Sequence, residues 1–222
     1  MQAVILAAGL GTRMKELTKD TPKSLLKSGG ERLLDHKLKN LPAGVEEVVI
    51  VVGYLGDEIR SALGDSFSGI PIKYVVQNEL KGTGHALSLC EPVIKDRFLV
   101  LMGDDLYKKE DLEKLVKFPL AISAYELVDA SGGGRWAELV QGGKGELLNI
   151  AEKQIARPGM LVSTGAHSLD ERFFKYPLQL AGNGTEELGL PQTIAYMAKA
   201  GEDVRIVKAS WWKNITEPED LE

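Results

Sequence analysis

The sequence predicts an α/β layered fold built on a mostly parallel sheet. Short apolar runs rich in β-branched residues alternate with amphipathic segments through the first half of the chain. The predicted strands are residues 2–8, 47–52, 72–77, 98–102 and 120–126. The predicted helices between them are residues 33–41, 57–63, 84–89 and 111–116. Strands joined by helical crossovers run parallel, so we expect a ligand site beyond their carboxyl ends.

The second half of the chain has a different pattern. A Gly-Gly-Lys-Gly turn separates strand-like segments at residues 135–140 and 147–151, which is typical of a hairpin. Beyond the hairpin we expect a strand at 160–168, a helix at 186–199 and a strand at 203–208. This half therefore does not continue the alternation of the first.

The bulk composition is that of an ordinary globular protein. The 222 residues, 44% hydrophobic and 27% charged, suit one domain or a core with an inserted lobe. A net charge of −5 argues against a general nucleic-acid-binding surface. Cys90 is the only cysteine, so no internal disulfide can form, which fits a reducing compartment. With no run long enough to span a membrane and no signal peptide, we expect a cytoplasmic protein without membrane or nucleic-acid partners.

The loop after the first strand is the most informative segment. It carries Gly9, Gly11, Thr12 and Arg13, and Lys23 follows ten residues after the arginine. Glycines let backbone N–H groups approach phosphate oxygens, and the two cations add charge-assisted donors. A P-loop is excluded because the lysine of that motif follows a glycine, whereas Lys23 follows Pro22. A dinucleotide-binding fingerprint is excluded because Met14 stands where that motif has its third glycine. The pattern indicates a nucleoside triphosphate site, and the alternative is a glycine-rich turn with solvated charges.

This segment resembles the opening signature of the sugar-1-phosphate nucleotidyltransferases. Residues 7–25 read AAGLGTRMKELTKDTPKSL, and the family reads A-A-G-x-G-T-R-[LM]-x-P-L-T-x-x-x-P-K-x-L. Glu16 stands where the family usually has proline. The resemblance extends to about residue 221 and implies the short form of the family, without an appended β-helix domain.

The resemblance also implies a fold. It is a Rossmann-like three-layer sandwich with a central mixed, mostly parallel sheet, which is the GT-A-like nucleotidyltransferase fold. Residues 1–222 would form a single domain, with a nucleotide-binding half at about 1–118 and a sugar-binding half at about 119–222.

A second motif lies where the strand at 72–77 ends. Gln77 can pair with the edge of a pyrimidine, and Gly82-Thr83-Gly84-His85-Ala86 follows it. The alternative is an exposed glutamine and a helix N-cap at Thr83, and His85 is expected only to pack. By resemblance, the nucleotide-binding set is Ala8, Gly9, Gly11, Thr12, Arg13, Gln77, Gly82 and Thr83.

Metal ligands are expected from two separate segments. Asp104 follows an apolar strand, where a carboxylate opposite a phosphate loop suits Mg²⁺. Residues 212–221 read WKNITEPEDL and resemble the family's W-x-D-[IV]-x-T-P-E-D-L, so the resemblance implies Mg²⁺ on Asp104 and Asn214. The alternative at Asp104 is an Asx turn that caps the strand. At the C-terminal segment it is a helix start at Pro218, which can hold together with metal binding.

Sugar contacts are implied by resemblance in the second half. Glu152-Lys153 matches the family's E-K-P, and Gly165 ends a match to its N-T-G. The implied sugar-binding set is Gly103, Glu152, Lys153, Gly165 and Glu187. The alternative for Glu152-Lys153 is a solvated strand edge. Gln154 replaces the proline of E-K-P and Ser163 replaces the asparagine of N-T-G, so the identity of the sugar stays open.

The implied reaction is transfer of a nucleotidyl group from UTP or dTTP to a sugar 1-phosphate, giving an NDP-sugar and pyrophosphate. Arg13 and Lys23 would be the catalytic residues, and no general base is needed because the attacking phosphate is already anionic. One alternative is a cytidylyltransferase acting on phosphocholine or a similar phosphorylated alcohol. Another is a non-catalytic regulatory subunit that binds a nucleotide-sugar. A homo-oligomer is also compatible with the sequence.

Overall fold

The computed structural model describes residues 1–129, 135–182 and 184–222. Its central sheet contains a parallel group formed by the first half of the chain: β1 (Gln2–Ala7), β4 (Glu47–Val52), β6 (Ile70–Val76) and β7 (Phe98–Met102). β1 lies between β4 and β7, with Ile5 opposite both Ile50 and Leu101. Because β1 and β4 are covered on both faces, they are nearly continuous runs of apolar residues.

The second half adds mainly antiparallel strands to the same sheet. β12 (Leu161–Leu169) runs antiparallel to β7 and also pairs with β9 (Ala121–Glu126) and β10 (Arg135–Gln141). β11 (Leu147–Ile155) completes the hairpin with β10, while β15 (Arg205–Lys208) lies parallel to β9. The sheet order is β11-β10-β12-β7-β1-β4-β6-β5, where β5 is Ser66–Phe67. The predicted mixed sheet is therefore confirmed, with its parallel strands concentrated in the first half.

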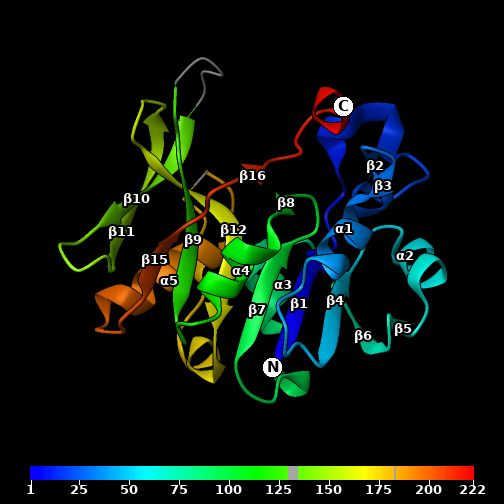
Figure 1. Cartoon of the computed structure of the whole chain (residues 1–222), viewed down its shortest axis with the longest axis horizontal. Helices are drawn as coiled ribbons and strands as arrows, with labels where there is room; N and C mark the ends of the chain where they lie inside the picture. The colour runs from blue at the N-terminus through cyan, green and yellow to red at the C-terminus, as the bar shows by residue number, and fades with distance from the viewer. Residues whose placement is uncertain (130–134, 183) are drawn as a thin grey trace.

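Helices cover both faces of this sheet (Figure 1). They are α1 (Leu33–Lys39), α2 (Gly56–Leu63), α3 (Thr83–Ser88), α4 (Lys109–Leu115) and α5 (Leu190–Lys199). Along β1, Val4 and Leu6 belong to a core shared with α3 and α5, whereas Ala3 and Ile5 belong to a core shared with α1, α2 and α4. This alternation is the period of two of a strand with both faces buried, and it gives the predicted three-layer sandwich.

Short elements complete the chain. The 3-10 helices are η1 (Thr12–Thr18), η2 (Lys23–Leu25), η3 (Glu91–Val93), η4 (Glu171–Lys175) and η5 (Pro218–Leu221). The short strands are β2 (Lys27–Ser28), β3 (Glu31–Arg32), β8 (Leu106–Tyr107), β13 (Gln179–Leu180), β14 (Leu188–Gly189) and β16 (Trp212–Lys213). η5 packs beside η1 and β2, so the end of the chain lies close to the loop after β1 (Figure 1).

The predicted elements agree with the structure except at their ends, and the largest difference is at residues 186–189. The helix expected at 186–199 begins at Leu190, because Leu188 and Gly189 pair with β13 before the helix starts. Pro191 then occupies the first turn of α5, where its missing N–H costs no hydrogen bond. In the part of the chain that the structure describes, no helix has the length and apolar character of a membrane span.

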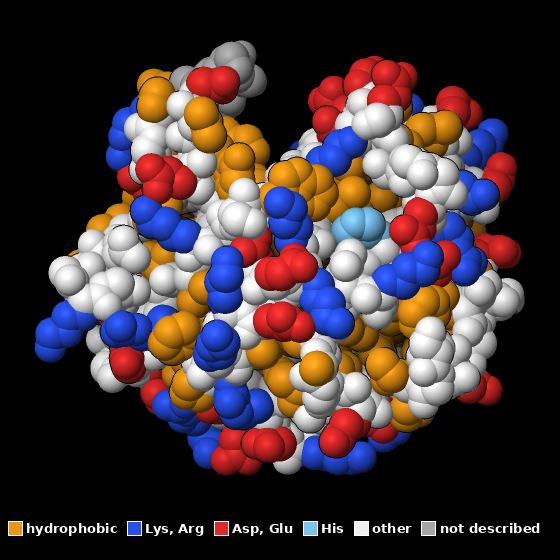
Figure 2. Space-filling model, viewed as in Figure 1, with side chains coloured by type: hydrophobic (Ala, Val, Ile, Leu, Met, Phe, Trp, Pro, Cys, Tyr) orange, Lys and Arg blue, Asp and Glu red, His pale blue; other side chains and the backbone are white. Residues whose placement is uncertain are grey.

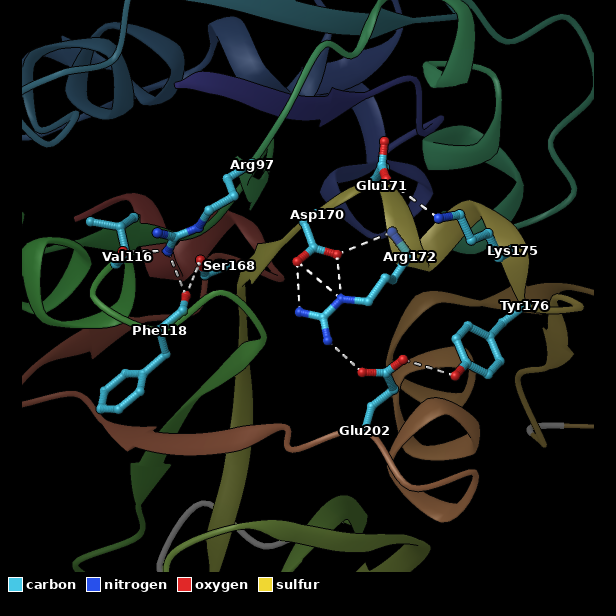
Figure 3. A network of polar contacts seen from close by, with 10 residues as sticks. All are labelled: Arg97, Val116, Phe118, Ser168, Asp170, Glu171, Arg172, Lys175, Tyr176 and Glu202. Carbon is cyan, nitrogen blue, oxygen red and sulfur yellow. Dashed lines mark hydrogen bonds and ion pairs between the residues drawn. The ribbon is translucent and has the colours of Figure 1, made fainter.

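Charged residues form hydrogen bonds near the amino end of β7, where β12 ends (Figure 3). Arg172 donates to Asp170 through Nε and Nη2 and to Glu202 Oε2 through Nη1, the last at 2.5 Å. Burial would raise the pKa of the Asp170 carboxyl, but hydrogen bonds from Arg172 outweigh it and keep that pKa below its ordinary value. Arg97, just before β7, donates to the carbonyl oxygens of residues 116 and 118. The network ties the end of β12 to the segment after α5.

Candidate active site

A cavity of about 480 Å³ opens beyond the carboxyl ends of β1 and β7. Many of the predicted site residues line it: Ala8, Gly9, Gly11, Thr12, Arg13, Lys23, Gln77, Gly82, Thr83, Gly103, Asp104 and Glu187. They meet because β1, β6 and β7 run parallel, so the loops that follow them reach the same edge of the sheet. On the face seen in Figure 2, cationic and anionic side chains are interspersed, and a notch separates the β10–β11 hairpin from the C-terminal end of the chain at η5.

The loop after β1 is held by its second glycine. Gly11 has a φ of 65°, and a Cβ there would lie 3.0 Å from both Lys23 Cβ and Thr18 Cγ2. Its carbonyl oxygen accepts hydrogen bonds from the Met14 N–H at 2.8 Å and from the Thr18 hydroxyl at 3.0 Å. A side chain at Gly11 would therefore push the loop away from Lys23. Arg13 is exposed at the cavity wall, where its guanidinium can reach a ligand.

Lys23 connects three segments of the chain. Its buried Nζ donates to Asp104 Oδ2 at 2.6 Å and to the Ile215 carbonyl oxygen at 2.5 Å. The first contact crosses from the loop after β1 to the end of β7, and the second reaches the C-terminal segment. An ammonium anchored in this way is a fixed positive charge at the cavity wall.

Asp104 and Asp105 have different environments although they are neighbours. The Asp104 side chain is 37% exposed and lines the cavity, whereas Asp105 is buried and accepts a hydrogen bond from Asn214 Nδ2 at 2.7 Å. Burial, together with the charge of Asp104, raises the pKa of Asp105 to about 7. Lys37, fully buried on α1, has its pKa lowered to about 8 by burial, against the attraction of these two carboxyls.

The donor set at this end of the cavity fits Mg²⁺. The ion favours one or two protein oxygens and takes its other ligands from phosphates and water, and Asp104 offers such an oxygen beside open space. Asn214 does not line the cavity; its Oδ1 accepts from the Thr216 hydroxyl and its amide holds Asp105. Its role as a metal ligand stays a prediction. Pro218 begins η5 with a capping box between Glu217 and Asp220, so the predicted helix start is confirmed.

The opposite end of the cavity is built around Gln77. Its Nε2 donates to the Gly82 carbonyl oxygen at 3.2 Å and lies 3.0 Å from His85 Nδ1, so His85 packs against the amide as expected. The alternative of an N-cap at Thr83 is wrong, because Gly82 occupies that position and the Thr83 hydroxyl accepts from the Leu190 N–H at 3.1 Å. This bond joins the starts of α3 and α5 at the cavity wall.

Two glycines of the predicted sugar-binding set occupy confined positions. A Cβ on Gly103 would lie 2.6 Å from the Leu6 carbonyl oxygen, which also accepts the Gly103 N–H at 2.8 Å. Gly165 has a φ of 77°, and its Cβ would lie 2.4 Å from Cγ of Met102, a lining residue. Gly103 thus forms the cavity surface, and Gly165 lies behind Met102.

Glu152 and Lys153 do not line the cavity. They lie inside β11, which extends beyond the strand predicted at 147–151. A register shift between Trp136 and Glu138 forms a bulge there, in which Lys153 has a φ of 56°. Glu152 Oε1 accepts a hydrogen bond from Gln192 Nε2 at 2.5 Å, and Gln192 does line the cavity. A direct sugar contact from Glu152 or Lys153 stays a prediction.

The structure adds lining residues that sequence reasoning missed. They are Leu6, Ala7, Leu10, Ser24, Leu80, Ala86, Met102, Ala181, Leu188, Gly189 and Gln192. Most are apolar and carry no chemical signal in a sequence. Gln192 had one available signal, since the proline before it marks a helix start.

Comparison with known proteins identifies nucleotidyl transferases as relatives of this chain. The family profile described as nucleotidyl transferase matches residues 2–222. The UTP–glucose-1-phosphate uridylyltransferase AglF of Haloferax volcanii is 32% identical over 99% of this chain and 93% of its own length. The bifunctional protein GlmU of Methanocaldococcus jannaschii is 27% identical, and this chain spans about half of it, 52%.

Solved structures share the fold over the whole chain. A Bacillus anthracis protein assigned as a glucose-1-phosphate thymidylyltransferase, solved with sucrose, has a TM-score of 0.80 and 26% identity, covering 100% of this chain and 92% of its own. The inositol-1-phosphate CTP transferase from T. maritima has a TM-score of 0.76 at 23% identity, covering 100% and 91%, and shows the fold alone.

Proposed function

Because the chain belongs to the nucleotidyl transferase family, we propose that it transfers a nucleotidyl group from UTP or dTTP to a sugar 1-phosphate. The single observation that carries the proposal is the anchored Lys23 ammonium beside Asp104 at the cavity wall. The 32% identity to a UTP-dependent enzyme that covers nearly the whole chain supports the uridylyl option. The reaction would belong to nucleotide-sugar biosynthesis, in the cytoplasm where nucleoside triphosphates are available.

The reaction needs positioning and charge neutralisation rather than a base. An anionic oxygen of the sugar phosphate attacks the α-phosphorus, a new P–O bond forms, and the bond to the β-phosphate oxygen breaks to release pyrophosphate. Lys23 stabilises the charge that gathers on the α-phosphoryl group. Arg13 and the N–H groups of Gly9 and Gly11 hold the leaving pyrophosphate.

Asp104 would hold Mg²⁺, with Asn214 as the proposed second ligand. When bound, the ion neutralises phosphate charge as a Lewis acid. Asp104 has its second oxygen for this purpose even while Lys23 occupies Oδ2. Asn214 reaches Asp105 rather than the cavity, so it would have to turn its amide oxygen away from Thr216.

The two ends of the cavity suit the two substrates. Gln77 presents an amide to a pyrimidine beyond β6, and Gly103, beyond β7, borders the proposed sugar end. Glu187, also proposed to contact the sugar, lies beside Gly82, since a Cβ on Gly82 would be 3.1 Å from Glu187 Cβ. Within one domain, we assign the nucleotide mainly to about residues 1–118 and the sugar mainly to about residues 119–222, with Gly103 as the contribution of the first half to the sugar.

The test is an assay of each nucleoside triphosphate with Mg²⁺ against sugar 1-phosphates and phosphocholine, with detection of pyrophosphate and product mass. A nucleotide-sugar formed from UTP or dTTP supports the proposal. Exclusive transfer from CTP to phosphocholine would replace it with the cytidylyltransferase alternative. Nucleotide-sugar binding without turnover on any pair would favour a regulatory subunit.

A further inference from the structure

The side chain of Gln192 lies between Glu152 and the cavity. It comes from the first turn of α5, lines the cavity and donates from Nε2 to Glu152 Oε1 at 2.5 Å. The two residues are 40 positions apart and come from α5 and β11. Glu152, whose carboxylate is the obvious partner for sugar hydroxyls, contributes no surface to the cavity itself.

Glu152 on one side and Gly189 on the other determine the orientation of the Gln192 amide. An ionised carboxylate only accepts hydrogen bonds, so the amide nitrogen must face Glu152 and the oxygen must face away. That oxygen packs over Gly189: a Cβ at position 189 would lie 1.8 Å from Gln192 Oε1. Glycine at 189 therefore makes room for the amide, since its own backbone, with a φ of −90°, would accept any residue.

In this arrangement the Gln192 amide keeps an acceptor, Oε1, and a second N–H donor that can bind a ligand. Among the described residues, none donates a hydrogen bond to Gln192 Oε1, and the second N–H of Nε2 is also available. A neutral acceptor and a neutral donor on a preoriented group suit a sugar hydroxyl, which can satisfy both. They also place no extra negative charge next to an incoming sugar phosphate.

We propose that Gln192 determines which sugar is accepted, by hydrogen bonding to one hydroxyl of the sugar 1-phosphate. Glu152 is a positioning residue that acts through the Gln192 amide, and Gly189 supplies the space for it. The inference rests on the proposed function and identifies the residue that selects among sugar 1-phosphates.

The test uses the best sugar 1-phosphate substrate and its monodeoxy analogues with wild type, Gln192→Met, Gly189→Ala and Glu152→Met. Wild type should lose about 10- to 100-fold in kcat/KM on one deoxy analogue, the size of one or two hydrogen bonds. Gln192→Met should lose a similar factor in kcat/KM on the parent sugar 1-phosphate. Its kcat/KM should then be the same for the parent sugar and for that deoxy analogue. Gly189→Ala, which displaces the amide without removing it, should show the same loss of discrimination.

The control is Gln179→Met, which removes another glutamine near α5 whose Nε2 donates to the Pro177 carbonyl oxygen outside the cavity. It should retain wild-type discrimination, and all variants should retain the KM for the nucleoside triphosphate. If Glu152→Met abolishes discrimination while Gln192→Met keeps it, Glu152 reads the sugar directly and the inference is overturned.

The two levels of the proposal fail differently. Transfer to a sugar 1-phosphate with unchanged discrimination in Gln192→Met would overturn this inference alone. Transfer only to phosphorylated alcohols that lack a sugar ring would overturn the proposed function and the inference together. Melting temperatures of the variants, compared with wild type, show whether a loss reflects folding.

Discussion

Lys23 Nζ lies 2.6 Å from Asp104 Oδ2, so the cation proposed for phosphate and the carboxylate proposed for metal are partners in this state of the protein. The lysine side chain is 10% exposed and the aspartate side chain 37%, so the pair is partly shielded from water. A shielded pair interacts more strongly than one on the surface. The contacts with Asp104 and with the Ile215 carbonyl oxygen use two of the three N–H donors of the ammonium, which leaves one for the phosphate in the proposed reaction.

The first prediction concerns the catalytic role of Lys23. Lys23→Ala should lower turnover about 10²- to 10³-fold, the effect typical of removing one donor to a developing oxyanion. The measurement is kcat with saturating nucleoside triphosphate and sugar 1-phosphate, accompanied by the melting temperature. A folded variant that turns over at the wild-type rate would remove Lys23 from the mechanism.

The second prediction concerns cation binding without nucleotide. Lys23→Met removes the ammonium that competes for Asp104, so Mn²⁺, used as a probe, should bind about 10-fold more tightly, which corresponds to about 1.4 kcal/mol. Calorimetric titration with Mn²⁺ measures this directly. Lys19→Met, at an exposed lysine of the same loop region, is the matched control and should bind as wild type does.

Adding Asp104→Asn to Lys23→Met identifies the carboxylate involved. The double variant should lose the gained affinity, because an amide oxygen carries no charge for the cation. A gain that persists in the double variant would show that Mn²⁺ binds elsewhere and would contradict the assignment of Asp104.

Much of the proposed nucleotide and metal site could be predicted from sequence because its residues follow strands. Gly11, Gln77 and Asp104 each come directly or soon after an apolar β-branched run, and parallel strands bring such positions to one edge. The layered α/β fold with a mostly parallel sheet was predictable for the same reason, since strands buried on both faces are unbroken apolar runs that alternate with helices, whereas the three-layer sandwich was implied by the family resemblance.

The sugar end was less predictable because its geometry depends on contacts between distant segments. α5 begins only at Leu190 because Gly189 pairs with Gln179 of β13, a contact that no local pattern encodes. The bulge at Lys153 shifts the strand by a residue and thereby decides what Glu152 faces. The hydrogen bond between Gln192 and Glu152 joins residues 40 positions apart, so neither their types nor their local spacing predicts it.

The third prediction concerns the close approach of the α3 start to β14. Gly82 has a φ of 94°, and a Cβ there would lie 2.5 Å from the Leu188 carbonyl oxygen, a backbone atom that cannot rotate away. Gly82→Ala should therefore destabilise the protein by about 1–3 kcal/mol. It should also weaken nucleotide binding, because Gln77 donates to the Gly82 carbonyl oxygen.

Urea unfolding and titration with UTP and dTTP measure the two effects. Gly143→Ala, in the β10–β11 turn, is the matched control because a Cβ there would meet no atom within 4 Å. It should leave both stability and binding near wild type. Equal behaviour of the two variants would mean that the contact between Gly82 and Leu188 is not tight in solution.

The fourth prediction is a pH dependence of stability that originates at His167. This residue lies in β12 between Val100 and Ile122, its ring is fully buried, and neither ring nitrogen has a hydrogen-bond partner among the described residues. Burial lowers the pKa of His167 to about 3, from an ordinary value near 6.5. Between these two values the unfolded chain binds a proton that the folded protein does not, so stability must fall as the pH falls through this window.

For this one group the fall approaches about 1.4 kcal/mol per pH unit well below pH 6.5. His167→Met removes the titrating ring and keeps an apolar side chain in the buried position. Its free energy of unfolding, measured in urea at pH 7, 6, 5 and 4.5, should therefore decline less steeply than that of wild type, by about that amount per pH unit at the acid end. The comparison of slopes separates this effect from any constant cost of repacking the core and from carboxyl groups common to both proteins. Parallel curves would mean that the His167 ring takes up a proton in the folded state, through a partner or through water that reaches β12.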